Sequence, residues 1–354
     1  MRPPMPPTPW SARMPIDLPF AEARAYAHGR APAPLLDLVG AMAGQAAATG
    51  ASLGVFEALS RGPRHAEALA GDLGCDPSGL ARLLALLHTT GYLELTDHGY
   101  GNAPVAAAWL CPPATYGHVL RVWQAVLGEL WADLAPAIRT GRPRGDLTAW
   151  LAERPEVSIP FQSLQRGLAQ WLAEEVAWLV PLPEGPLRLL DLAGGHGAYS
   201  LAFCAVHPGL TATVTDLPEA LGEGGHGRVE WRAADPLLDP VAGRYDVVLL
   251  CDVLHGFPAA QARRLVDGAV SATVPGGRVV ILETVAGARA GVAETAFTAG
   301  FDLNLWHTQG GGVLDVPTIT GWLASAGCGP IEHRDLSRSA THTLITARQP
   351  WRTL

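Results

Sequence analysis

The sequence has few cysteines and few charged residues for its length. Five cysteines are scattered through 354 residues without a Cys-x-x-Cys pair, which argues against a disulfide framework and against a zinc site built on thiolates. Reduced thiols in a cytoplasmic protein are the simpler interpretation. Charged residues make up only 16% of the chain, but hydrophobic residues make up 48%, so a wholly disordered chain is excluded.

Positive charge is also scarce, and no apolar run is long enough to cross a bilayer. The chain carries 25 Lys and Arg against 33 Asp and Glu, for a net charge of −8, whereas binding to phosphate groups needs clustered positive charge. Residues 41–56 are the most apolar run, but their Gln, Thr and Ser make them a poor membrane span. No apolar stretch follows the N-terminal charge, so no secretory signal is expected. We therefore expect a cytoplasmic protein that binds neither nucleic acid nor a membrane.

Proline content and apolar periodicity divide the chain into three parts. Residues 1–30 are rich in Pro, which disfavours helix, and are expected to form a flexible or loosely docked tail. Residues 31–180 carry apolar residues every three or four positions, as helices of a globular domain do. After residue 180 the pattern changes, and residues 181–354 alternate short apolar strands with helical segments.

The helical domain contains the order helix, helix, hairpin, which is typical of a winged-helix unit. Helices are predicted over residues 65–74 and 76–91, with Asp76 as the N-cap of the second. Residues 92–103 alternate apolar and polar around an Asp-His-Gly turn, as a small hairpin does. Arg82 is the one fixed positive charge of the second helix, so a packing or dimerisation role is favoured over DNA binding. A winged-helix regulator stays open as the alternative from another functional class.

The C-terminal domain is predicted to be a doubly wound α/β fold with a mostly parallel sheet. Continuous apolar strands that alternate with helices indicate a parallel sheet covered on both faces. Residues 331–336 and 342–348 are expected to add two closing strands near the C-terminus. The strands predicted before them span residues 187–193, 211–217, 229–235, 245–254 and 278–285.

A glycine-rich loop follows the first predicted strand of this domain, directly after Asp191. Gly194, Gly195 and Gly197 let the chain turn sharply and let a ligand approach the backbone closely. The helix that follows points its unpaired N–H groups at whatever binds there. Such a loop suits a nucleotide-like ligand at the carboxyl ends of the strands, although the missing Walker lysine disfavours ATP and GTP.

Acidic residues end the next two predicted strands. Asp216, followed by Leu217, stands 25 residues after Asp191, where a carboxylate can accept hydrogen bonds from ribose hydroxyls. Asp235, followed by Pro236, ends the third strand and can meet the edge of an adenine ring. One such acid alone would be expected to cap a turn. Three acids in register with one glycine loop favour a cofactor site.

Together these motifs resemble those of the S-adenosylmethionine-dependent small-molecule O-methyltransferases. This group includes plant caffeate and flavonoid enzymes and many bacterial enzymes that tailor polyketides and other natural products. The resemblance covers residues 35–348 and rests on five motifs in order: DLAGGHG, TDLPE, AADPL, YDVVLLCDVLHGF and VPGGRVVILETV. It implies a Rossmann-like catalytic domain after a helical domain that forms a homodimer and helps to roof the substrate pocket.

The resemblance also implies which residues bind S-adenosylmethionine. The glycine loop and the strand-end acids would hold it, and Cys251 stands where a basic residue often contacts its carboxylate, so that contact is expected to be lost or replaced. The implied cofactor-binding residues are Asp191, Gly194, Gly195, Gly197, Asp216, Leu217, Asp235, Pro236 and Cys251.

A base is needed for the chemistry that the resemblance implies. A phenol has a pKa of about 10 and is a poor nucleophile at pH 7 until a base engages it, and imidazole suits this task. His255 follows an apolar strand at the family's base position. Glu283, at the end of the next strand, matches an acid that orients this histidine in plant members. A carboxylate there would fix the tautomer of the imidazole and stabilise its charged form.

Other predicted site residues lie in a helix over residues 301–309, beside the acceptor pocket. Asn304, Trp306 and His307 are its polar and aromatic members, but helical spacing cannot place all three on one face, so at least one is expected to pack. No metal site is predicted, because HExxH is absent and no His, Asp and Glu cluster has ligand spacing.

Two departures from the family pattern leave another reaction open. Gly256 stands where an Asp normally follows the histidine, and the second catalytic acid would fall near Val316, with Asp315 as a substitute. An enzyme that keeps the cofactor but catalyses hydroxylation, decarboxylation or cyclisation is the alternative. The leading expectation is methyl transfer to a hydroxyl of a small aromatic or polyketide-like compound. The identity of the acceptor, and O- versus N- or C-methylation, are not fixed by the sequence.

Overall fold

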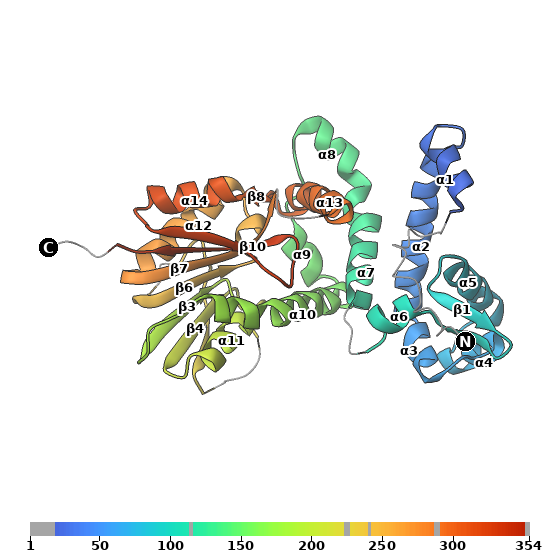
Figure 1. Cartoon of the computed structure of the whole chain (residues 1–354), viewed down its shortest axis with the longest axis horizontal. Coiled ribbons are helices and arrows are strands. Elements are labelled where there is room, and N and C mark those ends of the chain that lie inside the picture. Colours follow the sequence, from blue (N-terminus) through green and yellow to red (C-terminus); the bar gives the residue numbers. More distant parts are fainter. Residues whose placement is uncertain (1–17, 113–115, 223–226, 240–241, 287–290, 351–354) are drawn as a thin grey trace, which may run out of the picture. The chain divides into compact units, whose positions relative to one another are not determined.

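The computed structural model describes residues 18–112, 116–222, 227–239, 242–286 and 291–350. The chain divides into two compact units (Figure 1). One contains residues up to Leu130 together with Arg154–Leu164, and the other contains Trp131–Glu153 and Gln165–Leu354. Most of the predicted N-terminal tail lies outside the described residues, but Phe20–Ala27 forms helix α1.

The first unit confirms the predicted order of helix, helix and hairpin. The side chain of Asp76 accepts the N–H of Gly79 at 2.7 Å, as an N-cap should. Its hairpin is antiparallel and pairs Leu93 with Asn102. The elements of this unit after α1 are α2 (Pro34–Ser52), α3 (Val55–Ala58), η1 (Leu59–Arg61), α4 (Ala66–Leu73), α5 (Pro77–Thr89), β1 (Leu93–Thr96), β2 (Gly99–Asn102), α6 (Pro104–Trp109), α7 (Tyr116–Ala125) and η2 (Val126–Leu130).

The core of the first unit is built from the apolar faces of these helices. Phe56, Leu69, Leu84 and Leu87 are fully buried in one cluster, which is what the three-to-four-residue spacing predicts. Across the described ranges, no single helix combines the length and the apolar character of a membrane span. Helices Pro34–Ser52 and Val55–Arg61, bent by 64°, meet that test only as a pair.

The second unit is built on one mostly parallel sheet, as predicted. Its strand order is β5-β4-β3-β6-β7-β10-β9. Strands β5 to β7 along this order are parallel, and β10 and β9 close the sheet in antiparallel pairing. The strands are β3 (Leu187–Leu192), β4 (Leu210–Asp216), β5 (Val229–Ala233), β6 (Tyr245–Cys251), β7 (Thr273–Ala286), β9 (Ile331–Asp335) and β10 (His342–Arg348), and the short β8 (Leu314–Asp315) pairs with β7.

Two of these strands differ from their predicted limits by three residues or more, and the others by at most two. Strand β6 ends at Cys251 rather than at residue 254, because Asp252 has a left-handed φ of 58° and Leu254–Gly256 forms a short 3₁₀ helix, η4. A left-handed residue cannot continue a strand. Strand β7 begins at Thr273, before its predicted start.

Helices cover both faces of the sheet (Figure 1). On one face α11 (Ala198–Val206) and the end of α10 (Pro155–Leu179) pack on alternate strand residues such as Leu189. On the other face α12 (Ala259–Ala272) and α14 (Val316–Ser325) pack on the intervening residues, such as Leu190. The unit also contains η3 (Trp131–Asp133), α8 (Leu134–Thr140), α9 (Leu147–Ala152) and α13 (Val292–Gln309).

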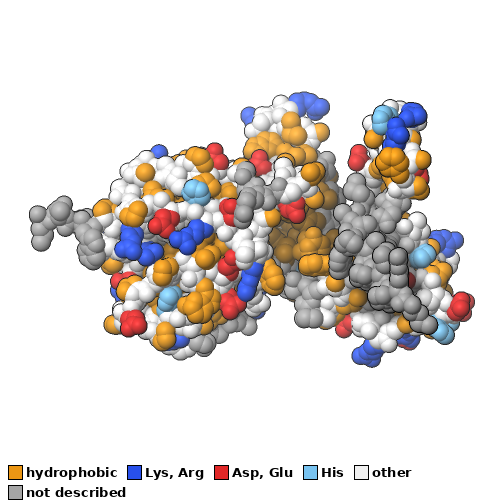
Figure 2. All heavy atoms as spheres, in the orientation of Figure 1, with side chains coloured by type: hydrophobic (Ala, Val, Ile, Leu, Met, Phe, Trp, Pro, Cys, Tyr) orange, Lys and Arg blue, Asp and Glu red, His pale blue; other side chains and the backbone are white. Residues whose placement is uncertain are grey.

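The surface of this unit carries charges of both signs. Figure 2 shows acidic and basic side chains mixed with apolar ones on the face that it draws. Several charged residues of this unit are paired, for example Arg338 with Glu174 at 3.2 Å and Arg232 with Glu230 at 2.8 Å. Such exposed pairs contribute little to stability, so the sheet and its two apolar layers hold this unit together.

Candidate active site

The glycine loop after β3 is packed too tightly for other residues at two of its positions. A β-carbon on Gly194 would lie 2.3 Å from Cγ of Asp191, and one on Gly197 would lie 2.9 Å from the ring of Trp231. Gly197 also has a φ of 71°, which side chains disfavour. The glycines therefore bring the backbone of the loop close to β3 and β5.

Asp216, at the end of β4, holds this loop in place. One of its carboxylate oxygens accepts the N–H of Gly195 at 2.9 Å, and the other accepts the N–H of Leu217 at 2.7 Å. Burial raises the pKa of Asp216, and these two hydrogen bonds act against that rise. Each carboxylate oxygen keeps a further lone pair, so Asp216 can still accept hydrogen bonds from the hydroxyls of a ligand.

Asp191 lies beneath the loop and is fully buried. Its Oδ2 accepts the hydroxyl of Ser200 at 2.8 Å, while its Oδ1 is buried without a hydrogen-bond partner among the described residues. Burial raises the pKa of this carboxyl to about 6. A buried polar atom without a partner is costly and is commonly satisfied by a ligand or water. The residues at this loop therefore fit a bound nucleoside.

Asp235 lies two residues after the end of β5 at Ala233, not at the strand end as predicted, and it has a local structural role. Its Oδ1 accepts the N–H of Leu237 at 2.8 Å and that of Leu238 at 3.2 Å, so it caps the turn that begins at Pro236. This is the turn-capping role that such an acid commonly has. Its contact with the adenine edge of a cofactor stays a prediction.

His255 and Glu283 meet at the carboxyl ends of β6 and β7. Nδ1 of His255 lies 2.6 Å from Oε2 of Glu283, which is 1% exposed. The other oxygen of Glu283 accepts the N–H groups of Val253 and Leu254. Because an ionised carboxylate can only accept, Nδ1 carries the hydrogen and Nε2 carries the free lone pair. This arrangement supports His255 as a base that acts through Nε2.

The electrostatic surroundings of His255 favour its charged form. Burial lowers the pKa of its imidazole, but the charge and hydrogen bond of Glu283 and the charge of Asp252 outweigh burial and raise the pKa above its usual value. The pair can therefore accept a proton and stabilise the imidazolium that results.

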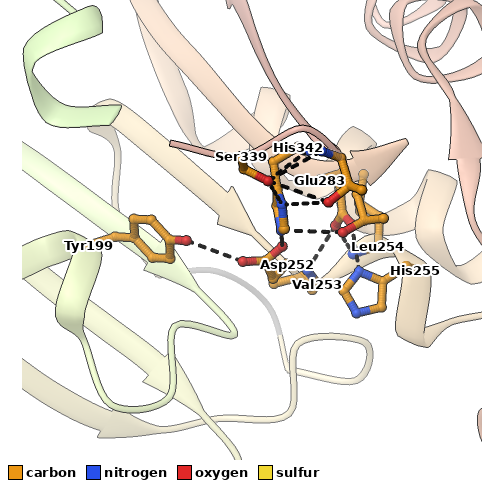
Figure 3. A network of polar contacts seen from close by, with 10 residues as sticks. Tyr199, Asp252, Val253, Leu254, His255, Glu283, Ser339 and His342 are labelled. Atoms are coloured by element: carbon orange, nitrogen blue, oxygen red, sulfur yellow. Dashed lines mark hydrogen bonds and ion pairs between the residues drawn. The ribbon is translucent and has the colours of Figure 1, made fainter. Parts of the chain in front are cut away.

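A second imidazole–carboxylate pair lies beside the first (Figure 3). Oδ1 of Asp252 lies 3.1 Å from Nε2 of His342, and Oδ2 accepts the hydroxyl of Tyr199 at 3.2 Å. None of these three residues was predicted as a site residue. Asp252 lies inside the motif CDVLHGF and could have been found there, but His342 is 90 residues further along the chain and carries no local signal.

Carboxylate and imidazole atoms of Asp252, His255 and Glu283 lie within 4.8 Å of one another. Both carboxylates already accept hydrogen bonds from protein donors, and each faces an imidazole. We therefore interpret the group as two hydrogen-bonded imidazole–carboxylate pairs. Cys251, next to them, is fully buried, and burial raises the pKa of its thiol far above the usual value. Cys251 accordingly brings no charge to the site.

Aromatic rings of α13 flank the base. The ring centroids of Phe301 and His255 lie 5.5 Å apart in an edge-on arrangement. The rings of Phe297 and Phe301 are stacked, with their centroids 6.0 Å apart. Phe297 is 54% exposed. The two rings offer an apolar wall next to His255, against which a flat aromatic ligand can pack.

Two of the three predicted pocket residues of α13 make hydrogen bonds to the segment at η3. Oδ1 of Asn304 accepts the indole N–H of Trp131 at 3.1 Å, and Nε2 of His307 lies 3.1 Å from Oδ1 of Asp133. Asn304 and His307 are buried, whereas Trp306 is half-buried. These contacts hold α13 in place, and a pocket role for the three residues stays a prediction.

The glycine-rich stretch after α13 supports the main chain at His255. The N–H of Gly312 donates to the carbonyl oxygen of His255 at 2.9 Å. Asp315, the residue nearest to the expected second acid, is exposed and caps α14 by accepting the N–H of Thr318 at 2.7 Å. Asp315 thus has a structural role, and its contribution as a second acid stays a prediction.

Comparisons with known proteins agree with this geometry. The family model described as an O-methyltransferase domain matches residues 131–328, and the model described as an O-methyltransferase dimerisation domain matches residues 37–111. A 3-hydroxy-5-methyl-1-naphthoate 3-O-methyltransferase from Streptomyces sahachiroi is 30% identical over 292 residues, which cover 78% of this chain and 84% of that protein.

Solved structures share the fold. The structure of mitomycin 7-O-methyltransferase has a TM-score of 0.79 and 24% identity, and the match covers 93% of this chain and 99% of that one. Human N-acetylserotonin methyltransferase in complex with S-adenosylmethionine has a TM-score of 0.74 and 21% identity, with 98% of this chain and 100% of that one covered. At these identities the likeness shows a common fold.

Proposed function

Because the chain belongs to the family of S-adenosylmethionine-dependent O-methyltransferases, which methylate a hydroxyl of a small molecule, we propose that His255 is its general base and that the acceptor is a phenolic natural product. One observation carries the proposal: Glu283 holds Nδ1 of His255 at 2.6 Å and so leaves Nε2 with the lone pair. A base within reach of a phenol hydroxyl contributes about 10²- to 10⁴-fold to such a reaction.

The cofactor supplies a methyl group that is already activated by the positive charge on its sulfur. We infer that the glycine loop, Asp191 and Asp216 hold it, with Leu217, Asp235, Pro236 and Cys251 around it. The unpartnered buried oxygen of Asp191 and the lone pairs that Asp216 keeps support this inference. The absence of side chains at the glycines lets a ligand approach the backbone of the loop closely.

The residues of this chain handle the proton. In the proposed reaction the proton of the acceptor hydroxyl would pass to Nε2 of His255, and the bound cofactor would supply the methyl group that the oxygen takes up, keeping the electron pair of its carbon–sulfur bond. Glu283 stabilises the imidazolium by its charge and its hydrogen bond. The proton then leaves His255 for solvent, since the side chain of His255 is 16% exposed.

An aromatic acceptor is supported by the wall that Phe301 and Phe297 form next to the base. A ring stacked on this wall would bring a hydroxyl on its edge toward His255. The name of the relative from Streptomyces sahachiroi gives a hydroxynaphthoate as its acceptor, which is an aromatic hydroxyl compound of this kind. Trp306, His307 and Asn304 are proposed as further pocket residues.

The assembly and the location of the protein belong to the same proposal. The dimerisation-domain match over residues 37–111 supports a homodimer. Five free thiols agree with a cytoplasmic location. We also keep the proposed division into a tail (1–30), a helical domain (31–180) and a catalytic domain (181–354). The alternative of a winged-helix regulator gives way, because both matching family models are those of O-methyltransferases.

The test is a methyl-transfer assay with labelled S-adenosylmethionine and a panel of phenols and hydroxynaphthoates. His255→Ala is expected to lower kcat by about 10²-fold or more while the affinity for S-adenosylhomocysteine stays unchanged in calorimetry. His333→Gln, at an exposed position of β9, is the control and should keep full activity. The base assignment is wrong if His255→Ala keeps a rate within threefold of the wild type.

The same assay also tests two alternatives: a reaction that does not transfer the methyl group, and a dependence of the rate on a metal ion. A different product that forms equally well with S-adenosylhomocysteine would indicate the non-methylating enzyme. Because both site carboxylates already have protein partners, adding EDTA is expected to leave the rate unchanged. A rate that falls with EDTA and returns with a divalent cation would contradict our interpretation of the carboxylates.

A further inference from the structure

We infer that His342 is a positioning residue for the base: it holds Asp252, and Asp252 fixes both the turn that leads to His255 and a negative charge beside the imidazole. This inference rests on the proposed role of His255. Neither His342 nor Asp252 is part of the glycine loop or of the His255–Glu283 pair, yet both lie at the same end of the sheet (Figure 3).

The backbone at Asp252 sets the direction of the groups that hold Glu283. Asp252 has a φ of 58°, a left-handed conformation that residues other than glycine adopt only when their surroundings hold them. Its N–H donates to the carbonyl oxygen of Leu282 at 2.8 Å. The next two N–H groups, those of Val253 and Leu254, then point at Glu283. A change in the turn at Asp252 would therefore move the carboxylate that orients His255.

The side chain of Asp252 is held from two directions. Tyr199 of α11 donates to Oδ2 at 3.2 Å, and Nε2 of His342 lies 3.1 Å from Oδ1. His342 is buried and begins β10, where it pairs with Thr284, the residue after Glu283 on β7. The antiparallel pairing of β10 with β7 thus places the imidazole of His342 near the carboxyl end of β7.

Ser339 keeps the hydrogen of His342 on the nitrogen that faces Asp252. Its hydroxyl oxygen accepts the N–H groups of Thr341 and His342, both at 3.3 Å, and lies 2.8 Å from Nδ1 of His342. The hydroxyl of Thr341 lies 3.3 Å from the same Nδ1, and that of Thr284 lies 3.3 Å from Nε2. Two hydroxyl groups can thus donate to Nδ1, whereas the carboxylate of Asp252 at Nε2 can only accept. Neutral His342 then carries its hydrogen on Nε2 and donates to Asp252. The contact does not require His342 to be charged.

Charge is the second part of the argument. Burial raises the pKa of Asp252, but the charge and hydrogen bond of His342, the charge of His255 and the hydroxyl of Tyr199 outweigh burial and lower it. Asp252 is therefore a carboxylate at neutral pH, and its charge acts on His255. The titratable groups that interact with the Asp252–His342 pair are His196 of the glycine loop, Tyr199 of α11, Cys251 of β6, His255 of η4 and Glu283 of β7.

Removal of His342 has a defined consequence in this arrangement. Without the charge and hydrogen bond of His342, the pKa of the half-buried Asp252 is expected to rise, because fewer groups then act against the effect of burial. His255 would have less negative charge beside it, and its pKa would fall. A glutamine at position 342 can place an amide N–H near the position of Nε2 and preserve the contact, whereas a leucine cannot.

The experiment is an NMR titration of the ring nitrogens of His255 in His342→Leu, His342→Gln and Asp252→Asn, with His255→Gln used to assign the signal. The pKa of His255 is expected to fall by about one unit in the leucine and asparagine variants and to stay near the wild-type value in the glutamine variant. Methyl transfer measured alongside is expected to slow about tenfold in His342→Leu and to be largely restored in His342→Gln.

Two outcomes would overturn the inference. One is a pKa of His255 that does not move in His342→Leu, and the other is a glutamine variant that is as impaired as the leucine variant, since then His342 only fills space. Should His342→Leu fail to fold, Ser339→Ala gives a milder test. It is expected to slow transfer only above the pKa of His342, where the neutral ring can lose its hydrogen from Nε2, and a pH-independent effect would contradict the inference.

The titration is made on the protein without acceptor, so the two proposals can fail separately. If His255→Ala methylates at the wild-type rate, the base assignment fails, while the coupling between His342 and His255 is still measured. If His255→Ala is inactive and the pKa of His255 is unchanged in the His342 variants, the base assignment stands and the inference about His342 fails.

Discussion

Gly311 lies against the main chain of His255. A β-carbon on Gly311 would be 2.1 Å from the carbonyl oxygen of His255 and 2.8 Å from the carbonyl carbon of Gly256. Gly312, the next residue, donates its N–H to the same oxygen of His255 at 2.9 Å. The loop after α13 thus packs directly on the backbone that carries the proposed base, and only glycine fits at position 311.

Gly311→Ala is therefore expected to damage the site. The added methyl group meets backbone atoms that cannot rotate away, so either the loop or the turn at His255 must move. We expect a fall in kcat of about tenfold or more and a loss of about 1–3 kcal/mol of stability in urea unfolding. Gly321→Ala is the matched control, since a β-carbon there meets nothing within 4 Å inside α14. Normal activity and stability in Gly311→Ala would show that the loop or the turn at His255 can move apart at little cost.

Glu283→Gln is expected to place the hydrogen of His255 on the wrong nitrogen. The amide oxygen can still accept the N–H groups of Val253 and Leu254. The amide nitrogen then faces Nδ1 of His255 and donates to it, so Nδ1 becomes an acceptor. Nε2 would carry the hydrogen, and kcat is expected to fall by about 10²- to 10⁴-fold.

The pH dependence of the methyl-transfer rate is a second measurement on Glu283→Gln. Glu283 raises the pKa of His255, and a base works only when deprotonated, so the wild-type rate rises with pH through a pKa above the usual histidine value. In Glu283→Gln that rise moves to lower pH. Glu332→Gln, at an exposed site of β9, should leave rate and profile unchanged. An unshifted profile in Glu283→Gln would contradict the assignment.

Asp216→Asn is expected to weaken cofactor binding. The carboxylate accepts one N–H on each oxygen, from Gly195 and from Leu217, and an amide has only one oxygen to accept them. One N–H would face an amide NH₂, and the glycine loop would lose its support. The Kd for S-adenosylhomocysteine, measured by calorimetry, is expected to rise about tenfold or more. Glu219→Gln, an exposed neighbour in the same segment, should bind normally, and equal affinities for both variants would argue against Asp216.

Asp191→Asn is expected to change how stability depends on pH. The pKa of the buried carboxyl is raised to about 6 from 3.8, so the folded protein holds this proton more tightly than the unfolded chain does. Wild-type stability therefore falls as pH rises from about 4 through 6, by about 3 kcal/mol from this group. The asparagine cannot ionise. The free energy of unfolding of Asp191→Asn in urea, relative to that of the wild type, should therefore rise over that range and be constant above it. A difference that does not change with pH would show that the pKa is not raised.

The local elements were largely predictable from the sequence. The strands of the sheet follow from continuous apolar runs, and the helix after Asp76 follows from its cap and its apolar spacing. These are properties of neighbouring residues, so they can be read without the fold. The end of β6 was wrong by a few residues, because the left-handed turn at Asp252 is held by contacts from elsewhere in the chain.

The site was predictable in part, for the same reason. Carboxyl ends of parallel strands meet at one edge, so the glycine loop, Asp216, His255 and Glu283 could be placed together before the structure was known. Asp235 could not be distinguished from a turn cap, and the partners of Asn304 and His307 could not be foreseen. Those contacts depend on how a separate segment, Trp131–Asp133, folds back onto α13.

Local patterns in the chain were enough to predict the sheet, the glycine loop after β3 and the imidazole near a strand end, because apolar periodicity, glycine and strand order act over short stretches of chain. The pairing of Asp252 with His342 and the contact of Gly311 with His255 became known only from the folded chain. The first pair is 90 residues apart and meets through the antiparallel register of β10 on β7. Such a register is set by packing of the whole sheet, and no local pattern in the chain specifies it.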